Sequence, residues 1–149
     1  MKNLVKMIAV LAIMFSTYTC RTITPVTNAV FLSEREGTIT VRSSGIGNTQ
    51  EKAQIAAEQN AFNTLFFRGF PNSSQKTPLI DYNEASIKQQ YNTYFDELYG
   101  KSRRYRTFVI YSQAVGDYTN KLQNVEISIN LRALRSDLEH AGVIRKFGY

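Results

Sequence analysis

One segment constrains the fold more than any other: a helical pattern that directly follows a strand pattern near residue 48. Alanine or leucine recurs at every fourth position, at Ala53, Ala57, Ala61 and Leu65. This spacing places them on one face of an α-helix, which we predict over residues 49–68. Side chains as small as alanine let such a helix lie close to a sheet. Asn48 and Glu51 favour a capping-box start, and Gly69 favours the helix end.

The strand before this helix is predicted from alternation. Ile39, Val41 and Ser43 alternate with Thr38, Thr40 and Arg42. A period of two with several β-branched residues is typical of a β-strand. Gly45 and Gly47 then end the pattern, as glycines often do at a turn.

Two more strands are predicted nearer the C-terminus. Residues 105–115 are apolar or aromatic at both odd and even positions, so we expect a central strand that is covered on both faces. Gly116 and Asp117 predict a turn. Apolar and polar residues then alternate from Val125 to Leu131. This alternation indicates a strand with one wet face, in a hairpin with the strand before it.

Helical patterns fill the remaining segments. A helix capped by Asp81 or Asn83 is predicted to run to about Tyr99, and a shorter one covers residues 133–141. The order is therefore strand, long helix, helix, strand, strand, short helix. We predict an α+β fold in which three or more mostly antiparallel strands pack on a long N-terminal helix. Residues 38–149 would form a single domain.

The N-terminus has the pattern of an export signal. Lys2 and Lys6 precede an unbroken apolar run over residues 7–15, and small polar residues follow. A basic start and an apolar centre of this length are typical of a secretory signal peptide, predicted here over residues 1–19. A transmembrane helix needs roughly 20 apolar residues, and this run is shorter.

Cys20 lies where such a signal would be cut, and it is the one cysteine of the chain. This pattern resembles the lipobox of bacterial lipoprotein precursors, although Thr17 and Tyr18 stand where aliphatic and small residues are usual. We predict that Cys20 carries a lipid, because two or more acyl chains anchor a protein stably. Residues 20–37 would then be a lipidated tether. The alternative is an ordinary secreted protein with a free thiol.

A further resemblance rests on Val41 to Gly47, a strand that ends in a Gly-x-Gly turn, and on the helical alanines Ala53, Ala57 and Ala61. With the two late strands, the chain resembles the FlgT N-terminal and LPP-type group of bacterial envelope lipoproteins over roughly residues 38–131. The resemblance implies a small α+β envelope domain that binds other proteins and is not an enzyme. Residues 70–100 depart from the group's pattern as a long insertion.

Charge and composition argue against several classes of function. The chain carries a net charge of +6, and +4 remains once Lys2 and Lys6 leave with the signal. Nucleic-acid-binding proteins usually show a denser basic stripe, so we expect no nucleic-acid partner. The densest basic stretch is KSRRYR, residues 101–106. It favours either an anionic ligand or a solvated strand start in which arginine stems lie over tyrosine rings.

Catalytic and ligand-binding patterns are weak. The turn over residues 45–50 lacks the third glycine of a dinucleotide fingerprint, so we read it as a tight turn. With His140 as the one histidine, too few soft ligands exist for zinc. Asp96 and Glu97 are adjacent, so on a helix they point in different directions. We therefore predict no catalytic residue, no metal and no cofactor.

Tyrosines and arginines of the second half form the predicted partner surface: Tyr91, Tyr94, Tyr99, Arg103, Arg104 and Arg106. Tyrosine and arginine are enriched at protein interfaces. We expect an exported, lipid-anchored protein of a bacterial cell envelope, which acts as a non-catalytic binding or assembly component and contacts an envelope protein. The alternative is a secreted hydrolase or carbohydrate-binding module, which would show a pocket with convergent polar groups.

Overall fold

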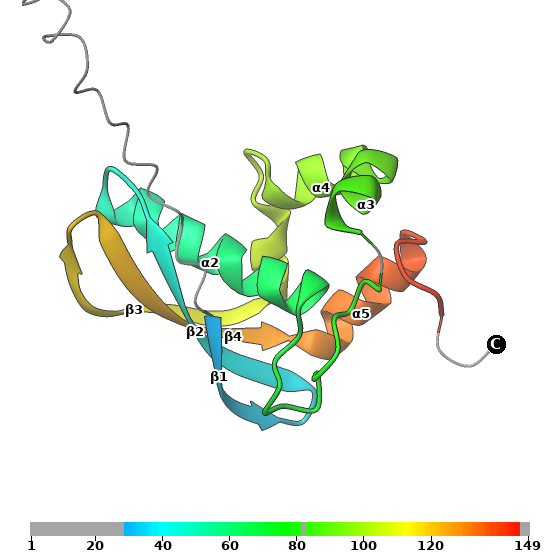
Figure 1. Ribbon diagram of the computed structural model, residues 1–149, viewed down its shortest axis with the longest axis horizontal. Coiled ribbons are helices and arrows are strands. Elements are labelled where there is room, and N and C mark those ends of the chain that lie inside the picture. Colours follow the sequence, from blue (N-terminus) through cyan, green and yellow to red (C-terminus); the bar gives the residue numbers. More distant parts are fainter. Residues whose placement is uncertain (1–28, 82, 147–149) are drawn as a thin grey trace, which may run out of the picture.

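An antiparallel sheet with helices on one face forms the frame of the molecule, as the computed structural model shows (Figure 1). The structure describes residues 29–81 and 83–146, and four strands in these residues pair in the order β1-β2-β4-β3. The strands are β1 (Ala29–Arg35), β2 (Thr38–Ile46), β3 (Val109–Thr119) and β4 (Leu122–Asn130). All pairs are antiparallel, so β2 and β4 are central while β1 and β3 are the edges.

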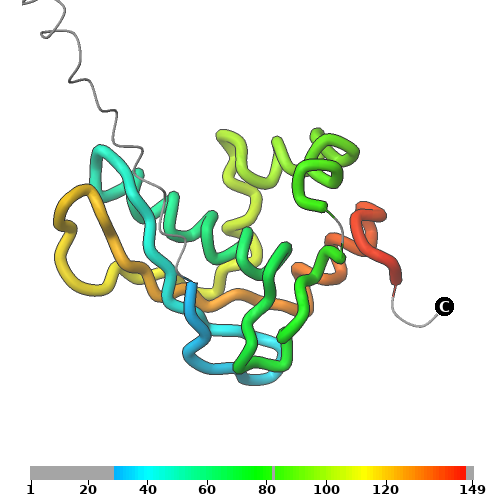
Figure 2. The backbone as a smooth tube through the Cα atoms, in the orientation of Figure 1, coloured from blue at the N-terminus to red at the C-terminus, as the bar shows by residue number. Residues whose placement is uncertain are grey.

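The helices lie above this sheet and beside one end of it (Figure 1). They are α2 (Gln50–Phe67), α3 (Glu84–Gln90), α4 (Asn92–Tyr99), the 3₁₀ turn η1 (Arg104–Phe108) and α5 (Leu131–His140). The chain path in Figure 2 shows α3 and the segment after α5 side by side, although they are far apart in sequence. None of the described helices is long and apolar enough to cross a membrane.

The core lies between α2 and the central strands. Ala53, Ala57 and Ala61 of α2 are fully buried over the sheet, as the four-residue spacing predicts. The helix approaches β2 so closely that a Cβ atom on Gly45 would overlap the backbone of Ala53 and Ala57. Glycine is therefore required at this position because no side chain fits between strand and helix.

The aromatic end of α2 extends the core beyond the sheet. Phe62 and Phe66 are fully buried, and the Phe62 ring lies 5.3 Å from the ring of Tyr105 in η1. Helices α3, α4 and α5 add further buried side chains to the same cluster: Ile87, Phe95, Leu98, Leu134 and Leu138. Burial of these rings and aliphatic chains is the main stabilising contribution.

The α+β class and the antiparallel sheet are confirmed, but the predicted element order is wrong at the start. Residues 29–35 form β1, which pairs with β2, so the predicted tether cannot extend to residue 37. The long helix α2 follows two strands and is not N-terminal. Residues 1–28, which include the predicted signal peptide and Cys20, lie outside the described residues.

The predicted second helix is two helices. At Tyr91 the backbone leaves the helical region, with φ −114° and ψ 38°, so α3 ends there and α4 begins. The predicted cap Asn83 is confirmed, since its side chain accepts hydrogen bonds from the N–H groups of Ala85 and Ser86. For α2 the cap is Thr49, which accepts from the N–H of Lys52, and not the predicted Asn48.

The prediction of a central strand over residues 105–115 is wrong. Residues 104–108 form η1, and β3 is an edge strand. Its apolar residues at both parities do not reflect two covered faces, because Ile110 and Tyr111 are exposed. The predicted hairpin with β4 is confirmed, but it turns at Asn120 and Lys121, which both have positive φ, and not at Gly116.

Candidate functional site

The face of the sheet opposite α2 is the main surface that the described helices leave uncovered (Figure 1). Its centre is polar. Thr40 of β2 stands opposite Ser128 of β4, and Arg42 stands opposite Glu126. The Thr40 hydroxyl donates to the Ser128 Oγ over 3.2 Å, and Arg42 lies 3.6 Å from the Glu126 carboxylate. We call this surface the open face.

The edges of the open face carry apolar side chains. Val30 of β1 pairs with Arg42 and is 52% exposed, whereas Ile110 and Tyr111 of β3 are 58% and 42% exposed. Leu32, at the β1 bulge, is also exposed. These are the large hydrophobic residues that the described part of the chain exposes most. An apolar rim around a polar strip is suited to contact with another molecule.

A shallow depression of about 580 Å³ lies on the open face. Ile110 and Tyr111 line it from β3. Its polar lining comes from the central strands and from the charged end of β1: Thr38, Thr40, Ser128, Ser33, Glu34, Arg35 and Glu36. The Tyr111 hydroxyl donates to Glu126 over 2.8 Å. This hydrogen bond, and then burial, raises the pKa of Tyr111. The depression offers hydrogen bonds and apolar contact, and the neighbouring acid Glu126 is already paired with Tyr111 and Arg42.

The predicted tyrosine surface is largely turned inward. The Tyr91 hydroxyl donates to the carbonyl of Gly142 over 2.8 Å, and the Tyr94 hydroxyl donates to Asp137 over 2.7 Å. Tyr99 donates to Asn63 over 2.9 Å, and burial raises its pKa well above the usual value. These hydroxyls join α3 and α4 to α2 and to the end of α5, so their polar groups already have partners within the fold.

The three predicted arginines are also paired within the chain. Arg103 lies 3.6 Å from Glu51, Arg104 lies 2.9 Å from Asp137, and Arg106 lies 2.9 Å from Glu58. The guanidinium of Arg104 stacks over the ring of Tyr94, 4.9 Å from its centroid. The guanidinium head of Arg104, and not its aliphatic stem, covers the tyrosine ring, and the stretch leads into η1 and does not start a strand. The basic stretch therefore offers less free positive charge than its sequence suggests.

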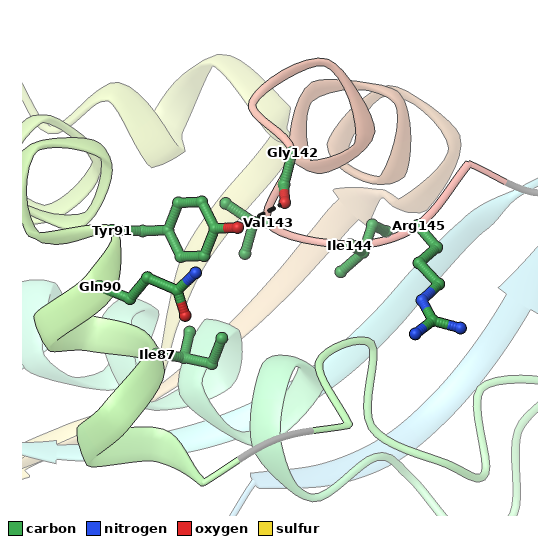
Figure 3. A pocket seen from close by; sticks show the side chains of 7 residues that line it. All are labelled: Ile87, Gln90, Tyr91, Gly142, Val143, Ile144 and Arg145. Carbon is green, nitrogen blue, oxygen red and sulfur yellow. Dashed lines mark hydrogen bonds between the residues drawn. The ribbon is translucent and has the colours of Figure 1, made fainter.

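Tyr91 also lines a cavity of about 520 Å³ between α3 and the segment after α5 (Figure 3). Ile87 and Gln90 line it from α3, and Val143 and Ile144 line it from the other side. Figure 3 shows the Tyr91 ring reaching across to Gly142. Because its hydroxyl is used in that contact, Tyr91 has a structural role here: it connects the end of α3 to the segment after α5.

One polar cluster was not predicted from the sequence. Glu58 of α2 is 1% exposed. Its carboxylate accepts hydrogen bonds from the Tyr105 hydroxyl at 2.8 Å, Arg106 Nε at 3.0 Å and the Ser112 hydroxyl at 2.7 Å. Burial, and then the hydrogen bond to Glu58, raises the pKa of Tyr105 to about 12. The cluster fastens η1 and β3 to α2.

The remaining chemical groups take structural positions. Gly47, in the glycine turn, donates its N–H to Lys121 and accepts from the Tyr118 hydroxyl, which ties the turn to the β3–β4 hairpin. His140 lies exposed at the end of α5, with Nδ1 2.6 Å from the Ser136 carbonyl oxygen. No group of three or more metal-ligating side chains occurs within residues 29–81 and 83–146.

Comparisons with family models, curated proteins and solved structures find no match to this chain. The resemblance to the FlgT N-terminal and LPP-type lipoprotein group therefore stays a prediction.

Proposed function

We propose that the chain is a membrane-tethered envelope lipoprotein that binds a protein partner through the open face and catalyses no reaction. The open face carries the proposal. It is a broad, uncovered surface with exposed Val30, Ile110 and Tyr111 around a hydrogen-bonding strip. Protein-binding surfaces combine apolar contact with satisfied polar groups in this way.

The anchor is supported by the N-terminal sequence. Lys2, Lys6 and the apolar run at residues 7–15 precede Cys20, and β1 begins at Ala29. Residues 21–28 can span at most about 30 Å, at roughly 3.5 Å per extended residue. A lipid at Cys20 therefore keeps the domain close to the membrane, where a weak contact becomes effective through high local concentration.

The anchor is tested by the mass of the mature N-terminus. Bacteria that express the full chain are fed an alkyne fatty acid, and a Cys20→Ser variant is the control. We expect a labelled chain that begins at Cys20, and no label in the variant. A soluble, unlabelled product cut elsewhere would contradict the anchor and favour the secreted hydrolase or carbohydrate-binding module.

The binding surface is tested by photo-crosslinking in the same cells. A photoreactive residue replaces Arg42, at the centre of the open face, or Lys52, which is exposed on α2. We expect a discrete crosslinked envelope protein from position 42 that disappears when Val30→Glu is added. Equal products from both positions, or a product unaffected by Val30→Glu, would contradict the open face as the partner site.

A further inference from the structure

The two edges of the sheet differ in their protection against further strand pairing. The end of β1 is charged, with Glu34, Arg35 and Glu36 in succession. The loop after α2 also reaches this edge, because both the N–H and the hydroxyl of Ser74 donate to the Glu34 carboxylate. Charged side chains and covering loops are common means of blocking an edge strand.

The β3 edge lacks such charges over its first eight residues. Its sequence from Val109 to Gly116, VIYSQAVG, has no charged residue. Among the described strands, β3 pairs with β4 alone. A strand with one partner directs alternate N–H and C=O groups outward, where they are available to another strand.

Two irregularities define how much of β3 is regular. The register shifts between Val109 and Tyr111, and again between Val115 and Thr119. At the second site the side-chain amide of Gln123 donates to the carbonyls of Val115 and Gly116, which fixes the distortion. The regular part is therefore the five-residue segment 111–115, and its middle residue is Gln113.

We propose that β3 pairs antiparallel with β3 of a second copy of this chain, about a two-fold axis at Gln113. An axis at the middle of the regular segment uses all five residues. It places Tyr111 opposite Val115 of the second copy, and Ser112 opposite Ala114. The two sheets then continue into one another, and the open faces of both copies lie on the same side.

The segment is complementary to itself. Tyr111 and Val115 give an aromatic contact with a β-branched residue, which is a favourable cross-strand pair. Ser112 and Ala114 are small and lie on the α2 side, opposite Ile127 and Val125 of β4. Ser112 borders a hollow of about 320 Å³ that Gln54 and Arg106 also line. No like charges face each other across the pairing. A second copy meets these requirements by symmetry.

The contact is small. Stable interfaces bury about 1,200–2,000 Å² of surface in total. Pairing of the five residues 111–115 with those of a second copy, together with the side chains around them, buries less. We expect a weak dimer in solution, which concentration on a membrane would strengthen. The pairing itself depends on the β3 edge and not on the anchor, so failure of lipid labelling at Cys20 leaves it standing.

Disulfide trapping tests the pairing in the full chain. In a Cys20→Ser background, Gln113→Cys places two thiols across the axis, with Cβ atoms about 5 Å apart, which mild oxidation can bridge. The matched control is Ser33→Cys on the β1 edge, which is also exposed. We expect a disulfide-linked dimer of twice the chain mass from position 113 and monomer from position 33.

Added charge tests the same register. Tyr111→Lys with Val115→Lys places lysines on both sides of the axis, and like charges across strands repel. We expect trapping at position 113 to slow by at least about tenfold, while circular dichroism shows an unchanged fold. Sedimentation of the Cys20→Ser chain without added cysteine should show the same weakening.

Three results would overturn the second copy as the occupant. They are equal trapping at positions 33 and 113, trapping that the lysines do not slow, and sedimentation as a monomer at the highest soluble concentration. Crosslinking from position 113 to a different protein alone would assign the edge to a foreign strand instead.

Discussion

The two faces of the sheet come from the same strands but are used in opposite ways. On the face under α2, Ile39, Val41 and Ile127 are fully buried. The buried carboxylate of Glu58 on the same side accepts three hydrogen bonds from η1 and β3. On the open face, the intervening residues form short polar pairs such as Arg42 with Glu126. Stability is therefore concentrated on one face, and the other face is left free for contact.

The sharpest test of this contrast is a pair of aromatic truncations. Phe62→Ala removes a fully buried ring and leaves a cavity, so we expect a loss of about 4 kcal/mol in the free energy of unfolding. Tyr111→Ala on the open face should cost less than about 1 kcal/mol. Urea unfolding measures both, and similar losses would contradict the assignment of stability to the covered face.

Removal of one carboxylate on each face gives the next largest difference. Glu58→Ala leaves the buried hydroxyl of Tyr105 without its acceptor, and an unsatisfied buried polar group costs about 2 kcal/mol. Arg106 and Ser112 also lose their acceptor, but the partly exposed Arg106 can be solvated. Glu126→Ala breaks a partly exposed pair and should cost below about 1 kcal/mol. If Glu58→Ala lowered the free energy of unfolding no more than Glu126→Ala, the Glu58 cluster would not contribute to the stability of the fold as we expect.

Alkaline pH should also separate the faces. The pKa of Tyr105 is raised to about 12 in the fold, whereas an unfolded tyrosine has a pKa near 10. The fold therefore favours the protonated phenol. The resulting stability is complete below pH about 10 and is lost as the pH rises to about 12. Thermal melts over this range should decline less steeply for Tyr105→Phe than for the unmodified chain.

Tyr111→Phe is the control for this titration, because Tyr111 is exposed and solvent screens its interaction with Glu126. We expect the decline of Tyr111→Phe to stay close to that of the unmodified chain. A stronger effect from Tyr111 than from Tyr105 would place the alkaline-sensitive contact on the open face.

The smallest predicted effect concerns the start of α2, the helix that separates the faces. Thr49 accepts a hydrogen bond from the N–H of Lys52, so Thr49→Ala should cost about 1 kcal/mol. Asn48→Ala, one residue earlier, should leave stability within about 0.5 kcal/mol. The melting temperatures of the two variants decide between them, and a larger loss at Asn48 would restore it as the cap.

Local patterns located the central strands and α2 because each is buried on one side, so its burial leaves a regular period in the sequence. They failed at the sheet edges. The sequence of residues 29–35 predicts a tether and not a strand, because β1 is short and half exposed and its place in the sheet is set by pairing with β2. The apolar sequence of residues 105–115 predicts a central strand, whereas Ile110 and Tyr111 of the edge strand β3 are exposed to solvent.

The Glu58 cluster lay beyond local reasoning for a different reason. Tyr105, Arg106 and Ser112 are 47 to 54 residues from Glu58 in the chain. In the sequence, Glu58 is one acid within a helix. Likewise the partners of the predicted surface tyrosines and arginines are distant in the chain. Tyr91, Tyr94 and Arg104 pair with Asp137 or Gly142 in and after α5. The other three residues pair with residues of α2, namely Asn63, Glu51 and Glu58.

The position of β1 has a mechanical consequence. With a lipid at Cys20, a pull on the domain is transmitted through β1, an edge strand that is hydrogen-bonded to β2. A pull along β1 loads those hydrogen bonds together in shear, whereas a pull across the strand opens them one after another. The direction of the force that a bound partner applies would therefore decide how much force the anchored domain withstands before β1 separates from β2.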